Sequence, residues 1–133
     1  MYAEAAELCA EGVTKLIALH PSIDRDELLA LARELIADRA AVTHSGADFI
    51  EIAAPAVTKA WALARHCAER GVAREAVIAF GDMPNDIPML QWAGRGVAVA
   101  NAHPQALAIA NEHAPSNEDD GVAIVLERLL ATE

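Results

Sequence analysis

Residues 76–90 read AVIAFGDMPNDIPML, and this stretch decides the fold class. An apolar run of five residues leads into a turn that carries Asp82, Asn85 and Asp86, and an apolar segment with helical spacing follows at once. A short, uninterrupted apolar strand next to a helix is typical of a parallel sheet covered by helices. In such sheets ligands bind beside the carboxyl ends of the strands. We therefore predict an α/β fold with a functional site at this turn.

The same alternation of strand and helix continues through the second part of the chain. Thr58 is a good N-cap and Gly71 a normal helix stop, and the pattern predicts helices over 59–70, 86–93, 104–110 and 121–130, with strands over 76–80, 96–100 and 112–114. The first part differs, with a strand over 13–19, a helix from Asp24 to about residue 37, and a hairpin of strands 41–44 and 49–52. We expect two domains, a small α+β unit over 1–53 and a parallel-sheet unit over 54–133, joined near residues 54–57.

Composition limits the possible partners and the cellular location. The 133 residues are 54% apolar but only 4% aromatic, which predicts a core of Ala, Val, Leu and Ile. A net charge of −10 argues against nucleic acid and against an anionic membrane surface. No apolar run approaches the roughly 20 residues that span a bilayer, and the acidic start does not resemble a signal peptide. We expect a cytoplasmic protein with reduced, buried thiols at Cys9 and Cys67, its five histidines at the surface or at helix ends, and Trp61 and Trp92 in the core.

The turn after the strand at 76–80 has the chemistry of a metal or phosphate site. A helix cap accounts for one of its three polar residues but not for all of them, whereas carboxylate and amide oxygens suit a hard cation such as Mg²⁺. Lys59 falls in the first turn of a helix, where a cation is unfavourable, so we expect it to point at an anion. Asn101 follows the strand at 96–100 and either borders the same site or caps the next helix.

Four segments together resemble the haloacid dehalogenase superfamily, and within it the Cof-type phosphatases. They are PAVTK at 55–59, GDMPND at 81–86, VAVANA at 97–102 and NEDDGVA at 117–123. By this resemblance, residues 1–53 are the end of an α/β cap domain. The rest is the C-terminal part of a Rossmann-like core.

The resemblance implies a magnesium-dependent phosphatase of small phosphorylated metabolites, similar to sugar phosphates, that acts through an aspartyl-phosphate. It implies that Asp82 is a direct metal ligand and that Asp86 completes the metal site by holding its water shell or orienting neighbours. Lys59 would pair with the phosphate and the nucleophile. Asn85 and Asn101 are assigned to phosphate or substrate binding.

The chain departs from the family in one respect that bears on activity. It contains no Asp-x-Asp-Gly-[Thr/Ser] motif, and Asp24-Arg25-Asp26 has the spacing but opens a helix. The nucleophile is therefore expected to be missing, either because the chain is a piece of a longer protein, which we favour, or because it is a natural truncation. We expect the chain alone to be inactive and its open sheet edges to favour self-association. A phosphotransferase similar to the phosphomannomutases, or a non-catalytic metabolite-binding module, remain as alternatives.

Overall fold

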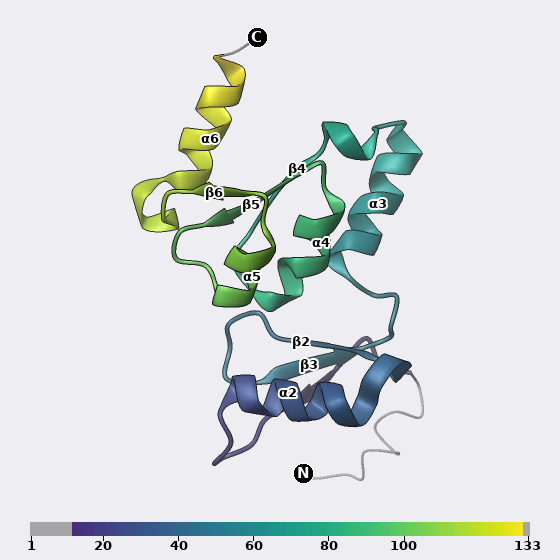
Figure 1. The fold of residues 1–133 in the computed structure, drawn as a ribbon. Coiled ribbons are helices and arrows are strands. Elements are labelled where there is room, and N and C mark those ends of the chain that lie inside the picture. Colours follow the sequence, from purple (N-terminus) through teal and green to yellow (C-terminus); the bar gives the residue numbers. More distant parts are fainter. Residues whose placement is uncertain (1–11, 132–133) are drawn as a thin grey trace. The chain divides into compact units, whose positions relative to one another are not determined.

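The computed structural model describes residues 12–131, which form two compact units (Figure 1). Within this range, unit 1 comprises residues 12–43 and 47–55, and unit 2 comprises residues 44–46 and 56–131. The hairpin tip at 44–46 therefore belongs with unit 2 rather than with the strands that it joins. Each unit has a hydrophobic core of its own.

Unit 1 is an antiparallel sheet packed against one helix. Its strands are β1 (Leu16–Ala18), β2 (Ala41–Thr43) and β3 (Ile50–Ala53), in the order β1-β3-β2. Helix α2 (Arg25–Ile36) has Asp24 as its N-cap, whose Oδ1 accepts from the Asp26 amide at 2.8 Å, and is followed by the 3-10 turn η1 (Ala37–Arg39). Leu29, Val42 and Ile50 form the core. The predicted helix and hairpin are confirmed, whereas β1 is shorter than predicted because only three of its residues pair with β3.

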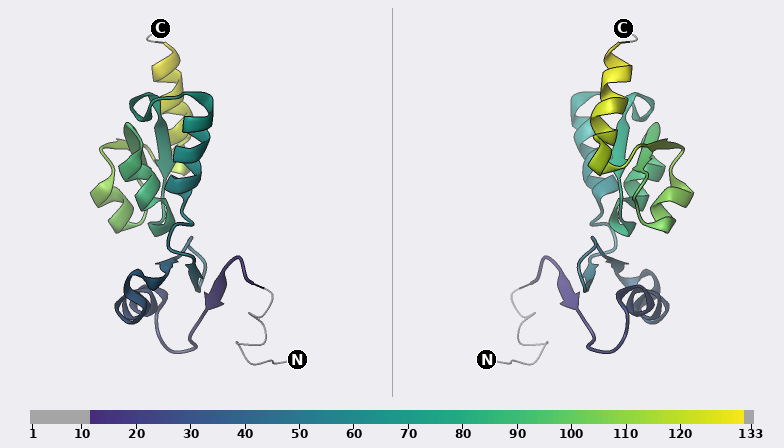
Figure 2. Two further views of the ribbon diagram at one scale, coloured as in Figure 1. Left: turned by 90° about the vertical axis from the view of Figure 1, so that its right-hand side faces the viewer. Right: turned by 90° about the vertical axis from the view of Figure 1, so that its left-hand side faces the viewer.

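Unit 2 is a three-stranded parallel sheet with four helices. Its strands are β4 (Ile78–Gly81), β5 (Arg95–Val99) and β6 (Glu112–Ala114), in the order β4-β5-β6. Its helices are α3 (Lys59–Arg70), α4 (Ile87–Trp92), α5 (Pro104–Ile109) and α6 (Gly121–Leu130), with 3-10 turns η2 (Arg74–Ala76), η3 (Pro84–Asp86) and η4 (Asn117–Asp119). Helices α4 and α5 lie together on one face of this sheet (Figures 1 and 2). The predicted α/β fold with a parallel sheet is confirmed, although β4 starts two residues late because residues 74–76 form η2.

The core of unit 2 is built from small aliphatic side chains, as the composition predicts. Strand β5 lies between two neighbours, and its Val97 and Ala98 are completely buried. Leu90 of α4, Ala106 of α5 and Val125 of α6 close over it. Each fully buried Val or Leu contributes about 1.5–3 kcal/mol, so this strand is the centre of stability of the unit.

Two predicted placements are wrong. Trp61, expected in the core, is 51% exposed in the first turn of α3, and the Arg65 guanidinium lies 5.6 Å from its ring centroid. Cys67 is instead the buried residue of that helix. His44, expected at the surface, is fully buried, because the hairpin tip packs into unit 2 and places its ring 5.5 Å from that of His103 in an edge-on arrangement.

The predicted thiol state is confirmed for one cysteine. Cys67 is buried and free, whereas Cys9 lies outside the described residues. Among the helices of residues 12–131, none is long and apolar enough to cross a membrane.

Candidate functional site

The turn after β4 is organised around the carboxylate of Asp86. Its Oδ2 accepts from the backbone amides of Asp82 at 3.0 Å and Met83 at 3.1 Å, which closes the turn between the strand and η3. Gly81 makes this possible, because a Cβ at that position would lie 2.6 Å from Asp86 Cβ and 3.0 Å from its Cγ. Asp86 is therefore an internal anchor that fixes the backbone of its neighbours.

Lys59 completes the surroundings of Asp86. Its Nζ donates to Asp86 Oδ1, and the lysine side chain is half exposed while that of Asp86 is buried. Burial alone would raise the pKa of Asp86, but the bonds from Lys59 and from the Asp82 and Met83 amides together lower it. We expect Lys59 to point at an anion, and in the structure that anion is the Asp86 carboxylate.

Asp82 is presented differently from Asp86. It lies one residue beyond the carboxyl end of β4 and is exposed. Its backbone is held on two sides, because its N–H donates to Asp86 and its carbonyl accepts from the His103 amide at 2.7 Å. Partial burial and the negative charge of Asp86 raise the pKa of the Asp82 carboxyl, and Lys59 only partly offsets this. A carboxylate held in this way gains from a cation beside it.

Asn85 supplies the observation that tests whether a metal or phosphate group fits here. Its Oδ1 is buried and has no hydrogen-bond partner among the described residues. A buried acceptor without a partner costs about 1–3 kcal/mol, and a bound donor or cation would remove that cost. Asn85 Oδ1 and the Asp82 carboxylate lie in the same turn, and both are hard oxygen atoms of the kind that suits Mg²⁺.

Asn101 lies in the turn after β5, at the same edge of the sheet. The suggestion that it caps the next helix is wrong, because His103 occupies the N-cap of α5 and accepts from the Gln105 amide at 3.2 Å. Asn101 instead bonds to Asn117 of η4. The sequence did not single out Asn117, since an asparagine in an acidic turn looks like an ordinary solvated residue. Asp82, Asn85 and Asp86 lie in the turn after β4, and Lys59 of α3 reaches that turn through its bond to Asp86. The turn that carries Asn101 is linked to it by the bond from the His103 amide to Asp82 O.

Comparison with known proteins identifies the family of the chain. The family model for haloacid dehalogenase-like hydrolases matches residues 2–126. The chain is 45% identical over 78 residues to the 5-amino-6-(5-phospho-D-ribitylamino)uracil phosphatase YitU of Bacillus subtilis, covering 59% of this chain and 29% of that protein. It is 35% identical over 104 residues to the HMP-PP phosphatase of Cronobacter sakazakii, covering 76% of this chain and 37% of that protein.

A solved structure shows the same fold. The chain superimposes on SMU.1108c of Streptococcus mutans with a TM-score of 0.77 and 31% sequence identity, covering 89% of this chain and 45% of that one. The chain thus spans less than half the length of these proteins. The matches confirm the predicted Rossmann-like type of core and the predicted family. The chain belongs to the haloacid dehalogenase-like hydrolases, in their Cof-type branch.

Proposed function

We propose that this chain carries the magnesium-binding side of a phosphatase that acts on small phosphorylated metabolites. The relatives to which it is similar are named as phosphatases of such compounds. In this proposal the nucleophilic aspartate, which would form the aspartyl-phosphate, comes from a part of the enzyme that the sequence does not contain. The 133-residue chain is therefore inactive by itself, and residues 1–53, of which the structure describes 12–53, are the end of the cap domain.

The contrast between the two acids of the turn carries the proposal. Asp86 uses both carboxylate oxygens within the protein, whereas Asp82 stands exposed at the end of β4 with a raised pKa. A turn with a purely structural role needs an acid such as Asp86, which bonds to the backbone, and is not stabilised by an exposed acid such as Asp82. An exposed carboxylate in the same turn as a buried, unpartnered Asn85 oxygen offers two oxygen atoms that a cation would stabilise.

Each residue then has a separate task. Asp82 would hold Mg²⁺ directly, and Asp86 would orient the ligand turn and the metal's water shell through its bonds to the Asp82 and Met83 amides. Bound Mg²⁺ would supply neutralisation of the phosphoryl charge. Lys59, held by Asp86, would add a positive charge toward the phosphate. The buried Oδ1 of Asn85 would accept from a donor on the substrate or on metal-bound water.

The substrate class follows from the relatives rather than from a residue of this chain. The substrates in their names are 5-amino-6-(5-phospho-D-ribitylamino)uracil and HMP-PP, and we propose a similar small phosphorylated compound. We also propose a cytoplasmic location, with which the free thiol of Cys67 is consistent.

A magnesium titration of the isotope-labelled chain tests the proposal. We expect Mg²⁺ to shift the backbone amide signals of Asp82, Met83, Asn85 and Asp86 and the side-chain amide signal of Asn85. The variant D82N should lose this response, whereas D48N, which removes the same charge from an exposed turn in unit 1, should keep it. Retention of full Mg²⁺ affinity by D82N would contradict the assignment.

A turnover assay with p-nitrophenyl phosphate tests the second half of the proposal. The chain alone should give no magnesium-dependent hydrolysis. Turnover by the pure chain that D82N abolishes would show that the nucleophile lies within these 133 residues.

A further inference from the structure

Two asparagines tie together the turns that follow β5 and β6. The Nδ2 of Asn101 donates to Oδ1 of Asn117, and Oδ1 of Asn101 accepts from the backbone N–H of Asn117 at 3.2 Å. Both bonds lie at the carboxyl edge of the parallel sheet, which is also the edge of Asp82. The Asn101 side chain thus uses its oxygen and one of its N–H groups in hydrogen bonds to Asn117.

The orientations of both side-chain amides follow from one backbone group. A backbone N–H can only donate, so the Asn101 atom that faces the Asn117 amide must be its oxygen. The other end of the Asn101 amide is then NH₂, and the Asn117 atom that it meets must be an acceptor. Asn117 is thereby left with its own NH₂ directed away from Asn101.

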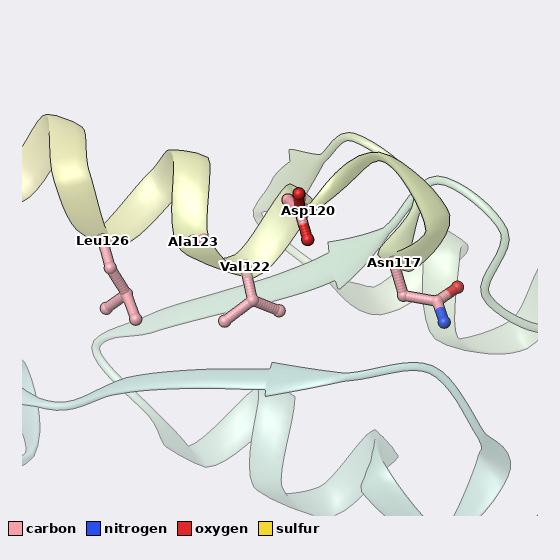
Figure 3. A pocket seen from close by; sticks show the side chains of 6 residues that line it. Asn117, Asp120, Val122, Ala123 and Leu126 are labelled. Atoms are coloured by element: carbon pink, nitrogen blue, oxygen red, sulfur yellow. The ribbon is translucent and has the colours of Figure 1, made fainter.

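The free end of the Asn117 amide borders a hollow beside α6. This hollow has a volume of about 320 Å³ and is lined by Asn117, Asp120, Gly121, Val122, Ala123 and Leu126. Figure 3 shows the Asn117 amide nitrogen on the side toward which Val122 and Leu126 also project. Two N–H donors therefore face a hollow whose wall is apolar at Val122, Ala123 and Leu126 and also includes the acid Asp120.

The loop that carries Asn117 leaves the amide little other freedom. Ser116 Oγ caps η4 at 3.2 Å from the Glu118 amide, and Ser116 O accepts from both Asp119 and Gly121 at 3.0 Å. A side chain at Gly121 is excluded, because its Cβ would lie 2.0 Å from Pro115 O. With the backbone fixed, the contact with Asn101 decides which end of the Asn117 amide faces outward.

We infer that Asn101 is a positioning residue, which holds the Asn117 amide with its NH₂ outward as a donor to a phosphate oxygen of the substrate. The inference rests on the proposed function for the identity of the ligand, and it moves the ligand contact from Asn101 to Asn117. The turn of Asn101 is coupled to the metal turn by the bond from the His103 amide to Asp82 O. The turns that carry Asn101 and Asn117 therefore lie at the same carboxyl edge of the sheet as Asp82.

Side-chain amide exchange measured by NMR on the labelled chain tests the positioning directly and needs no activity. In the wild type, one Asn101 NH₂ proton should exchange slowly, and both Asn117 NH₂ protons should exchange fast. In N101D an oxygen replaces the Asn101 NH₂, so the Asn117 amide should turn over and one of its protons should become slow. Slow Asn117 protons in the wild type, or no change in N101D, would overturn the inference.

The order of the variants separates positioning from a merely structural tie. N101D keeps two hydrogen bonds to residue 117, whereas N101A keeps none, so N101A should lower the melting temperature more. The outward exposure of the Asn117 NH₂ group should be reduced more in N101D than in N101A, because N101D reverses the Asn117 amide whereas N101A only leaves it free to rotate. A shared order in both measurements would show that Asn101 only ties the loops together.

Binding of inorganic phosphate in the presence of Mg²⁺ tests the ligand half. Phosphate should shift the Asn117 NH₂ signals, and N101D should weaken its Kd about 3- to 10-fold, as expected for one lost hydrogen bond. S116D is the matched control, since Asp also caps a helix and adds the same charge next to Asn117 without reversing its amide; N101D should bind more weakly than S116D. Shifts at Asp82 without shifts at Asn117 would contradict this inference alone. No phosphate response at either residue would contradict the proposed function as well.

Discussion

Replacing Asp86 by Asn should destabilise unit 2 far more than the same replacement at Asp82. An amide offers one oxygen and one NH₂, but Asp86 meets donors on both sides, with Lys59 at Oδ1 and two backbone N–H groups at Oδ2. Whichever way the amide is turned, a donor faces a donor. Hydrogen bonds to a charged group contribute about 1.5–3 kcal/mol each, so we expect D86N to lower the free energy of unfolding by about 2–4 kcal/mol.

D82N is the matched comparison, because it makes the same chemical change four residues away. Asp82 is exposed, and partial burial and the charge of Asp86 already disfavour its ionised form. We expect D82N to change the stability by no more than about 0.5 kcal/mol, or to increase it.

Tryptophan fluorescence during urea or thermal unfolding measures both variants. The sequence has two tryptophans, Trp61 and Trp92, and both lie in unit 2, so the signal reports that unit alone. A loss of 2 kcal/mol corresponds to a fall in melting temperature of about 8–16 °C for a domain of 60–100 residues. Equal losses in D82N and D86N would refute the separation of an anchoring acid from a ligand acid.

Three further predictions concern other parts of the chain. G81A should cost about 1–3 kcal/mol by overpacking and displace the Asp86 side chain, which the NMR signals of Asp82 and Met83 would report; G71A, whose Cβ meets nothing within 4 Å, should leave those signals in place. The bidentate bond from Arg95 (2.6 and 2.7 Å) lowers the pKa of Glu112. The small stabilisation from this ion pair should therefore be present above the pKa that Glu112 has in the unfolded chain, and it should be lost as the pH falls through the pKa of Glu112 in the folded chain. An NMR titration in which R95A leaves the pKa of Glu112 unchanged would exclude this cause. Finally, the chain should self-associate through the open edge of β4 and the apolar side of α6, and L126K should reduce the effect; a monomer at all concentrations in light scattering would contradict it.

The sequence predicted the elements of unit 2 well, because each of them has local signals. Thr58 and Gly71 bound α3, and the structure places that helix over Lys59–Arg70 as predicted. The continuous apolar runs predict a parallel sheet, and the polar residues that follow the first of them predict the turn after β4. These features depend on residues that are close together in the sequence, so they can be predicted from the sequence alone.

Features that depend on tertiary contacts were not predictable in the same way. The pattern could not show that Asp86 bonds inward while Asp82 stands exposed, since both are acids in one short turn. It could not show that Asn101 meets Asn117, sixteen residues away. His44 lies in a polar hairpin tip, and only the packing of that tip into unit 2 explains its burial.

The strand order of unit 2 also sets the sequence in which its amide protons should exchange with solvent. Strand β5 has a partner on each side and is buried from Gly96 to Val99, so its protons should be replaced last. In the described part of the chain β4 has a partner on one side only, and the alternation of a parallel ladder directs the Ile78 and Phe80 amides toward the other side. These protons should be replaced before those of β5. The strand that leads to the candidate metal ligand is thus an edge strand, whose local opening costs less than that of β5, and a ligand bound at its end would be detected as slower exchange along the strand.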